Sequence, residues 1–233
     1  MTKTLKIYVG WDSREDIAWQ VCRHSILRHA SRPVEIYPLK QPMLRELGLY
    51  TRDKDNAATE FSITRFLTPW LSAHDGWSIF VDCDFLFTDD VWKILDEIEP
   101  GKALHVVQHD YTPVNAVKMD GKQQTVYPRK NWSSFMLFDA AHPKVRALTP
   151  EVVNTASPAH LHRFEWLEDD EIGALDLKWN FLEGEYAKPA QTPVCIHYTN
   201  GGPWFENWQD VDFGDLWQAE RDLYLAKASA SAA

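Results

Sequence analysis

Residues 78–87 read SIFVDCDFLF and place Asp82 and Asp84 within a run of apolar side chains. Residues two apart at the end of a strand point to the same face, so we expect the two carboxylates to lie side by side. Carboxylates that close repel each other, and burying them is costly, unless a cation lies between them. Their oxygens suit Mg²⁺ or Mn²⁺, which commonly link protein carboxylates to phosphate groups. The alternative is a pair of acids that faces solvent or forms an ion pair with Arg65.

A late segment, residues 194–205 (VCIHYTNGGPWF), offers a third ligand for such an ion. His197 ends an apolar strand and precedes Gly201 and Gly202, where backbone can approach a ligand closely. A histidine would complete an Asp/Asp/His metal site. The alternative is a core histidine whose hydrogen bonds are satisfied by the protein.

A second group of acids lies in residues 166–181 (WLEDDEIGALDLKWNF), where Glu168, Asp169, Asp170 and Glu171 stand at the start of an expected helix. Acids in a first helical turn are often only a solvated group that is favourable to the helix dipole. The functional interpretation is a carboxylate that faces the reacting carbon of a sugar.

Strands and helices alternate over the first hundred residues, which predicts an α/β fold with a mostly parallel sheet. In such sheets ligands gather at the carboxyl ends of the strands. We expect Asp12 or Ser13 to cap the first helix. The expected strands cover residues 4–10, 33–39, 77–84, 103–108, 133–140 and 194–198, and the expected helices cover 12–30, 61–71 and 89–98.

Composition narrows the class of protein. The chain has 233 residues, which predicts one domain over 1–225, followed by a flexible tail at 226–233 (AKASASAA). The net charge of −10 argues against nucleic acid and anionic membranes as partners. Three cysteines without a CxxC pair, no apolar run of membrane-spanning length and no signal-peptide core predict a cytoplasmic protein, with at most a transient encounter with the inner membrane. The GxGxxG, GxxxxGK, HExxH and GxSxG motifs are absent.

The ordered set of segments resembles GT-A-type glycosyltransferases, and most closely the retaining glycosyltransferase family 8. The similarity covers about residues 5 to 208. It includes an opening strand and turn (IYVGWDSRED), an Arg-bearing helix (FSITRFLTPWL), the DxD strand (IFVDCDFLF), a later strand (SSFMLFD), an acidic segment followed by Trp-Asn (EDDEIGALDLKWNF) and a closing HYTNGGPWF. The resemblance implies a Rossmann-like mixed sheet flanked by helices.

The resemblance also implies roles for individual residues. The metal, Mn²⁺ or Mg²⁺, would be held by Asp82, Asp84 and His197 and would bind the diphosphate of a UDP-sugar. Asp170, with Asp169 beside it, would lie near the anomeric carbon. The residues implied to contact the nucleotide-sugar are Val9, Trp11, Asp12, Arg65, Asp82, Gly201 and Gly202.

Three positions depart from the family pattern. Gly202 stands where a phosphate-contacting Lys is usual, Asp170 stands where Gln is usual, and Trp132 replaces an Asn. Arg129 and Lys130 are candidates for the missing cation.

The implied activity is transfer of a hexose from UDP-glucose or UDP-galactose to an acceptor hydroxyl, with retention of configuration, in surface-polysaccharide or lipopolysaccharide synthesis. The acceptor would be a carbohydrate or glycoconjugate. Asp170 as nucleophile would give a double displacement, and front-face attack is the other route. The alternatives are a non-catalytic nucleotide-sugar-binding protein and a DxD-type metal-dependent phosphatase, whose motif normally lies near the N-terminus.

Overall fold

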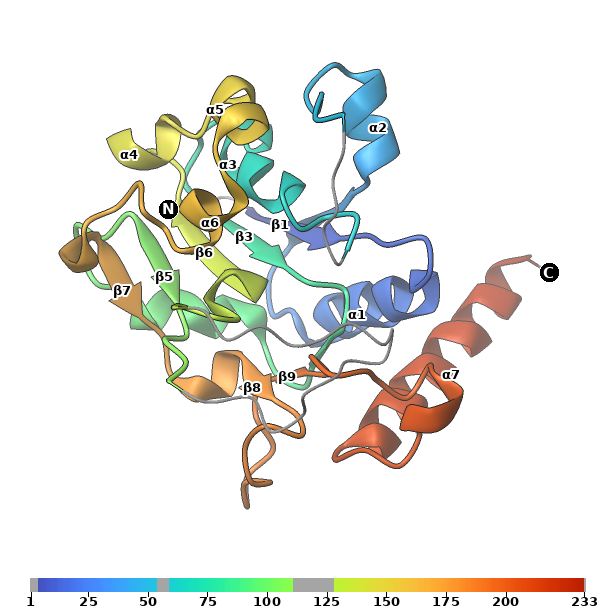
Figure 1. The fold of residues 1–233 in the computed structure, drawn as a ribbon. Coiled ribbons are helices and arrows are strands. Elements are labelled where there is room, and N and C mark those ends of the chain that lie inside the picture. Colours follow the sequence, from blue (N-terminus) through green and yellow to red (C-terminus); the bar gives the residue numbers. More distant parts are fainter. Residues whose placement is uncertain (1–3, 54–58, 111–127, 233) are drawn as a thin grey trace.

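The computed structural model describes residues 4–53, 59–110 and 128–232, which form two sheets with helices around them (Figure 1). Apart from residues 34–39, where only Leu39 is buried, the strands are mostly buried, because their runs of apolar residues face neighbouring elements on both sides. They are β1 (Leu5–Gly10), β2 (Val34–Leu39), β3 (Trp77–Val81), β4 (Phe85–Phe87), β5 (Leu104–Val106), β6 (Phe135–Asp139), β7 (Ile172–Ala174), β8 (Phe181–Leu182) and β9 (Cys195–His197).

The larger sheet has six strands in the order β2-β1-β3-β6-β5-β7. β1 pairs in parallel with β2 and β3, and β5 pairs in parallel with β7. β6 is antiparallel to both of its neighbours, β3 and β5. Five strands therefore run in one direction, and the predicted mixed, mostly parallel α/β sheet is confirmed. The carboxyl ends of β1, β3, β5 and β7 lie at one edge, which we call the carboxyl edge.

The smaller sheet has three strands in the order β4-β9-β8. β4 is antiparallel to β9, which is parallel to β8. The strand expected at 194–198 therefore belongs to this second sheet and not to the first. Residues 82–84 connect β3 of one sheet to β4 of the other, so the two acids lie where the sheets meet.

The helices cover the large sheet on both sides. Figure 1 shows α3, α4, α5 and α6 on one side and α1 on the other, with α7 packed beside α1. No helix in the described part of the chain has the length and apolar character to cross a membrane. The bounds are α1 (Asp16–His29), α2 (Gln41–Glu46), α3 (Thr68–Leu71), α4 (Pro143–Arg146), α5 (Pro150–Thr155), α6 (Pro158–His162) and α7 (Gly214–Ala232). Short 3₁₀ turns cover Thr64–Leu67, Val91–Glu97, Trp132–Ser134, Asp169–Glu171, Leu177–Trp179 and Glu206–Trp208.

Several helical predictions differ from the structure. The helix expected at 61–71 is a 3₁₀ turn followed by the single turn of α3, because Pro69 has no N–H to continue the earlier hydrogen bonds. The segment at 89–98 is 3₁₀ rather than α, and Asp90 accepts a hydrogen bond from the Trp92 N–H at 3.1 Å. α1 begins later than expected, and Glu15 holds the cap position in place of Asp12 or Ser13.

The end of the chain also differs from the expectation. Residues 226–232 of the tail predicted to be flexible are helical, because α7 continues through Ala232, and residue 233 lies outside the described residues. Alanine has the highest helix propensity of the amino acids, so an alanine-rich segment can extend a helix that is already formed. A single domain over 1–225 stays a prediction.

Candidate metal centre

Asp82, Asp84 and His197 come together, with one ligand atom from each lying within 4.8 Å of the others. Asp82 directly follows β3, Asp84 directly precedes β4, and His197 ends β9. The antiparallel register of β4 and β9 places Phe85 opposite His197, which brings the imidazole to the strand-end acids. The predicted convergence of these three residues is therefore confirmed.

Asp82 forms an ion pair with a cationic side chain of the protein itself, Arg65. Arg65 Nη1 lies 3.0 Å from Asp82 Oδ1 and donates a hydrogen bond to the Ser133 carbonyl at 2.7 Å. Arg65 is buried, and its guanidinium lies 4.8 Å from the centre of the Phe80 ring. The ion pair that the sequence left open as an alternative thus exists, but it involves only Asp82.

Asp84 has a different environment. Its Oδ2 lies 3.3 Å from His197 Nε2, while its Oδ1 is buried and has no hydrogen-bond partner among the described residues. A buried carboxylate oxygen without a partner is costly. Together with Asp82 and a histidine it forms a donor set of hard oxygens and one nitrogen that fits Mn²⁺ or Mg²⁺.

Glu15 adds a further carboxyl that the sequence analysis missed. It is buried, and its pKa is raised to about 8 by burial first and then by the charges of Asp84 and Asp12. The accumulation of acids around Asp84 increases the local demand for a cation. Its place at a helix start resembles an ordinary capping residue, so no local pattern indicated its burial.

The His197 ring is held on two sides. Its Nδ1 lies 2.9 Å from Asn180 Oδ1, and its face stacks on the Phe85 ring with centroids 4.3 Å apart. The ring therefore has Nδ1 beside Asn180 and Nε2 beside Asp84.

Three predicted nucleotide contacts lie near the end of β1 and in the turn that follows it. Val9 is buried in the core, and its carbonyl accepts a hydrogen bond from the Trp19 indole at 3.3 Å. Trp11 is half-buried, donates to Asp16 at 2.7 Å, and has the Lys40 ammonium 4.2 Å from its ring centre. Of Val9 and Trp11, only Trp11 presents exposed surface to a ligand.

Asp12, the third of these residues, is fully buried in the turn. Its carboxylate accepts hydrogen bonds from Arg14 Nε at 2.9 Å and from the Glu60 backbone N–H at 3.2 Å. Burial alone would raise the pKa of Asp12, but the hydrogen bonds from Arg14 hold it below its usual range. Asp12 therefore organises the turn.

Gly201 and Gly202 lie close to aromatic rings. A Cβ on Gly201 would come within 2.8 Å of the Trp208 ring, and a Cβ on Gly202 within 2.0 Å of the Trp204 ring. Gly201 also has a φ of +141°, which disfavours any other residue. The sequence suggested that backbone at these glycines approaches a ligand closely. In the structure it approaches the indole rings of Trp208 and Trp204.

Asp169 and Asp170 do not join the three converging residues. They lie in a 3₁₀ turn before β7 and not at the start of a helix. Their distance from Asp82 follows from the pairing across the sheet. Trp77 is in register with Asp139, and the Asp139 N–H donates to the Ala103 carbonyl. The Ala103 N–H in turn donates to the Glu171 carbonyl. Glu171 is thus level with Trp77, which is five residues before Asp82. At about 3.3 Å per residue, Glu171 and Asp82 are therefore roughly 16 Å apart along the strand direction.

The carboxylate of Asp169 has a partner, and so does the backbone carbonyl of Asp170. Lys102 Nζ donates to the Asp170 carbonyl at 2.9 Å, and Asp169 pairs with Arg129. The expectation that Asp170 faces the reacting carbon beside the strand-end acids is therefore not met by this arrangement. Arg129 pairs with Asp169 and also donates to the Arg163 carbonyl, and its role as the missing phosphate contact stays a prediction. Lys130, the other candidate, is buried.

Two further histidines near the centre were not singled out from the sequence. His162 Nδ1 lies 2.8 Å from Ser133 Oγ, and burial and then Arg65 lower its pKa to about 3. His109 Nδ1 lies 3.0 Å from the Tyr186 hydroxyl, and burial and then His197 lower its pKa to about 3. Both imidazoles are neutral at physiological pH, and neither lies in a motif that could have indicated its position.

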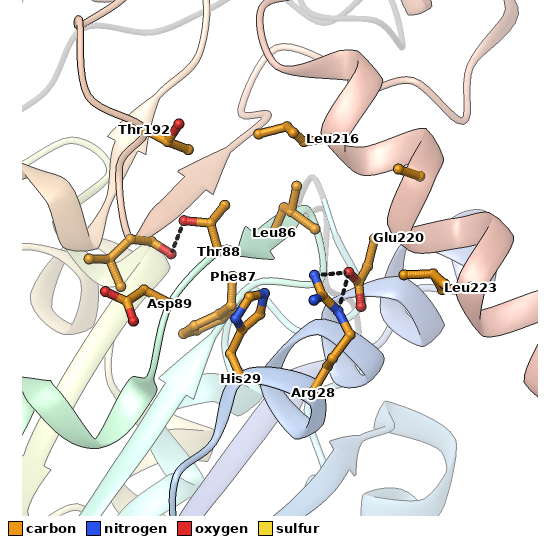
Figure 2. Close-up of a pocket in the computed structure, with 12 residues that line it drawn as sticks. Arg28, His29, Leu86, Phe87, Thr88, Asp89, Thr192, Leu216, Glu220 and Leu223 are labelled. Atoms are coloured by element: carbon orange, nitrogen blue, oxygen red, sulfur yellow. Dashed lines mark hydrogen bonds and ion pairs between the residues drawn. The ribbon is translucent and has the colours of Figure 1, made fainter.

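A pocket of about 410 Å³ lies away from the three converging residues, between the end of α1, β4 and α7 (Figure 2). Leu86, Leu216 and Leu223 contribute apolar walls, and Arg28 pairs with Glu220 at its side. Of its β4 residues, Leu86 faces away from Phe85 because successive strand residues alternate, and Phe87 at the end of the strand also lines the pocket.

The architecture is that of the GT-A-type glycosyltransferases. The chain aligns over 95% of its length with the bifunctional glycosyltransferase WbbM, at a TM-score of 0.66 and 15% identity. It aligns over 98% with the apo form of glycosyltransferase GlyE from Streptococcus pneumoniae TIGR4, at 0.63 and 12%. It aligns over 93% with the galactosyltransferase LgtC in complex with donor and acceptor sugar analogs, at 0.59 and 10%. The chain spans 50% of the WbbM chain, 64% of the GlyE chain and 95% of the LgtC chain. At these identities the likeness shows the fold.

A nearer relative shows the family. The chain is 53% identical over 227 residues to Protein CDI of Arabidopsis thaliana, which covers 95% of this chain and 88% of that protein. It therefore belongs to the same family as Protein CDI. No protein-family model matches the chain.

Proposed function

We propose that this chain is a metal-dependent glycosyltransferase that moves a sugar from a nucleotide-sugar donor to an acceptor hydroxyl. The observation that carries the proposal is the contact of Asp84 with His197 at the carboxyl edge of a GT-A-type sheet, where Asp84 Oδ1 is buried and has no hydrogen-bond partner in the described part of the chain. Carboxyl edges are where such sheets bind ligands.

Asp82, Asp84 and His197 would hold the ion, Mn²⁺ or Mg²⁺. When bound, the ion supplies charge stabilisation for the diphosphate that leaves the donor sugar. Arg65 holds Asp82 in place, because its guanidinium is itself held by the Ser133 carbonyl. Trp11 is the residue of the first turn whose exposed surface can contact the base, since an indole face stacks well on rings.

The proposed donor is UDP-glucose or UDP-galactose, and the proposed acceptor is a carbohydrate or glycoconjugate. The configuration of the sugar would be retained, as in family 8. Because Asp170 lies near the other edge of the sheet, the proposal for retention is front-face attack and not a double displacement through Asp170. A cytoplasmic location and a role in surface-polysaccharide synthesis stay predictions from the sequence.

A donor screen tests the proposal. The purified chain is incubated with Mn²⁺ and each of the common UDP- and GDP-sugars, and nucleoside diphosphate release is measured. We expect UDP release from one UDP-hexose, dependent on added metal, and its loss by at least about 100-fold in Asp84→Asn. Release that survives in Asp84→Asn, or that needs no metal, would contradict the proposal.

A second candidate is a non-catalytic nucleotide-sugar-binding protein. The observation that favours it is the combination of Gly202 in the place of a phosphate-contacting Lys and the Trp204 ring packed against that glycine. Thermal-shift titration with UDP, with and without Mn²⁺, separates the two. Metal-dependent binding without turnover of any donor would favour the binding protein.

A further inference from the structure

We infer that Asn180 is a positioning residue that holds the His197 imidazole with its proton on Nδ1, so that the Nε2 lone pair faces Asp84. The inference rests on the proposed function, because it concerns a residue that acts through a proposed metal ligand. Asn180 lies between the 3₁₀ turn at Leu177–Trp179 and β8, and it is fully buried.

The orientation of the Asn180 amide follows from its neighbours. Asn180 Nδ2 donates to Ser134 Oγ at 2.9 Å and lies 3.4 Å from the Asn131 carbonyl. A backbone carbonyl can only accept a hydrogen bond, so the amide nitrogen, and not the amide oxygen, must face it. The Ser134 hydroxyl donates its own proton to the same carbonyl at 2.7 Å and therefore accepts from Asn180.

The protonation of His197 follows from that orientation. With Nδ2 turned toward Ser134, Oδ1 of Asn180 is the atom 2.9 Å from His197 Nδ1. An amide oxygen is an acceptor, so His197 Nδ1 must carry a proton. Ser134 Oγ, 3.5 Å from the same nitrogen, has already donated its proton and offers only lone pairs there.

The proton on Nδ1 leaves Nε2 as the ring nitrogen that can bind a metal ion. In the neutral imidazole with a proton on Nδ1, Nε2 has a lone pair, and it points at a carboxylate oxygen 3.3 Å away. Nε2 and a carboxylate oxygen at this distance need either a metal ion or a proton between them, and a metal ion that binds Nε2 replaces that proton. Outer hydrogen bonds that fix the ring of a metal-binding histidine commonly change metal affinity by 10- to 100-fold.

The geometry of the small sheet explains why Asn180 is placed for this role. β8 and β9 are parallel, with Leu182 in register with His197. Asn180 directly precedes β8, and its side-chain oxygen lies 2.9 Å from Nδ1 of His197. A chain segment far from β3 and β4 thus sets the state of the histidine that meets their acids.

The test combines metal binding with a direct reading of the imidazole. Isothermal titration with Mn²⁺ alone is carried out on the full chain and on Asn180→Ala. The matched control is Asn154→Ala, an amide in α5 that donates to the Leu49 and Pro150 carbonyls and accepts from the Thr51 N–H. We expect the Mn²⁺ dissociation constant to rise about 10- to 100-fold in Asn180→Ala and to stay within about twofold in Asn154→Ala.

Nitrogen-15 NMR of the histidines in the wild-type chain keeps the inference testable even if Asn180→Ala does not fold. We expect a proton on Nδ1 of His197 both without metal and with Mg²⁺. An unprotonated Nδ1, or unchanged Mn²⁺ binding in Asn180→Ala, would overturn the inference.

His197→Ala separates this inference from the proposed function. If His197→Ala also binds Mn²⁺ like the wild type, the metal centre itself is wrong. If only His197→Ala loses affinity, the metal centre stands and the role of Asn180 is wrong.

Discussion

Arg65 and Asp82 form an ion pair inside the protein, with Nη1 and Oδ1 3.0 Å apart and side chains 7% and 14% exposed. The same guanidinium nitrogen donates to the Ser133 carbonyl in the segment before β6. One buried cation therefore links the DxD turn to the segment before β6, whereas Asp84 Oδ1 has no hydrogen-bond partner among the residues that the structure describes.

Replacing Arg65 tests how much this link stabilises the fold. We expect Arg65→Met to lower the free energy of unfolding by about 3 kcal/mol, because it leaves Asp82 without its buried partner. The control is Lys93→Met, which breaks a 2.7 Å pair with Asp89 whose side chains are 56% and 45% exposed, and which should cost under about 1 kcal/mol. Urea denaturation measures both, and equal losses would contradict the argument.

The raised pKa of Glu15 predicts a pH dependence of stability in the metal-free chain. The folded-state pKa is about 8, against 4.5 for the unconstrained group, so the folded chain binds more protons between these values. The contribution of Glu15 to stability is therefore fully present below about pH 4.5 and declines until about pH 8.

The variant Glu15→Gln removes this titration. We expect it to be more stable than the wild type at pH 8.5, by on the order of a few kcal/mol, and to lose that advantage at pH 5. Chemical denaturation at the two pH values is the measurement. If the difference in free energy of unfolding between wild type and variant does not change with pH, the pKa of Glu15 is not raised in the folded chain.

Asp170→Asn tests where the chemistry occurs. Asp170 lies beside Lys102 before β7, and Asp84 lies at the carboxyl edge, so only Asp84 should matter for sugar transfer. We expect donor turnover in Asp170→Asn to stay within about threefold of the wild type, because no contact of the reacting groups is lost. A loss comparable to that in Asp84→Asn would restore Asp170 as a nucleophile.

The packing of Trp204 against Gly202 can be measured with a double-mutant cycle. A Cβ on Gly202 would lie 2.0 Å from that ring, so Gly202→Ala should destabilise the protein by about 2 kcal/mol through overpacking. In a Trp204→Ala background the same change should cost much less, which gives a coupling energy of about 1–2 kcal/mol. Additive effects would mean that the ring does not contact the glycine.

Local sequence patterns were enough for the α/β class and for the two acids. Apolar runs predicted β1 and β3, because a buried strand needs apolar side chains on both faces. The spacing of Asp82 and Asp84 predicted that they lie close together, and they do, although β3 ends at Val81 and both acids lie in the connection to β4 rather than in an extended strand. These inferences need only neighbours in the sequence, and they agree with the structure.

Only the tertiary structure decided which distant residues meet these acids. His197 reaches them through the register of β9 on β4, whereas the register of β7 on β5 keeps Asp170 near the other edge. The burial of Glu15 and the hydrogen bond of Asn180 likewise depend on chain segments that pack together from far apart in the sequence. A local pattern states which side of a strand a residue faces, but pairing between strands decides at which end of the sheet it lies and what it touches.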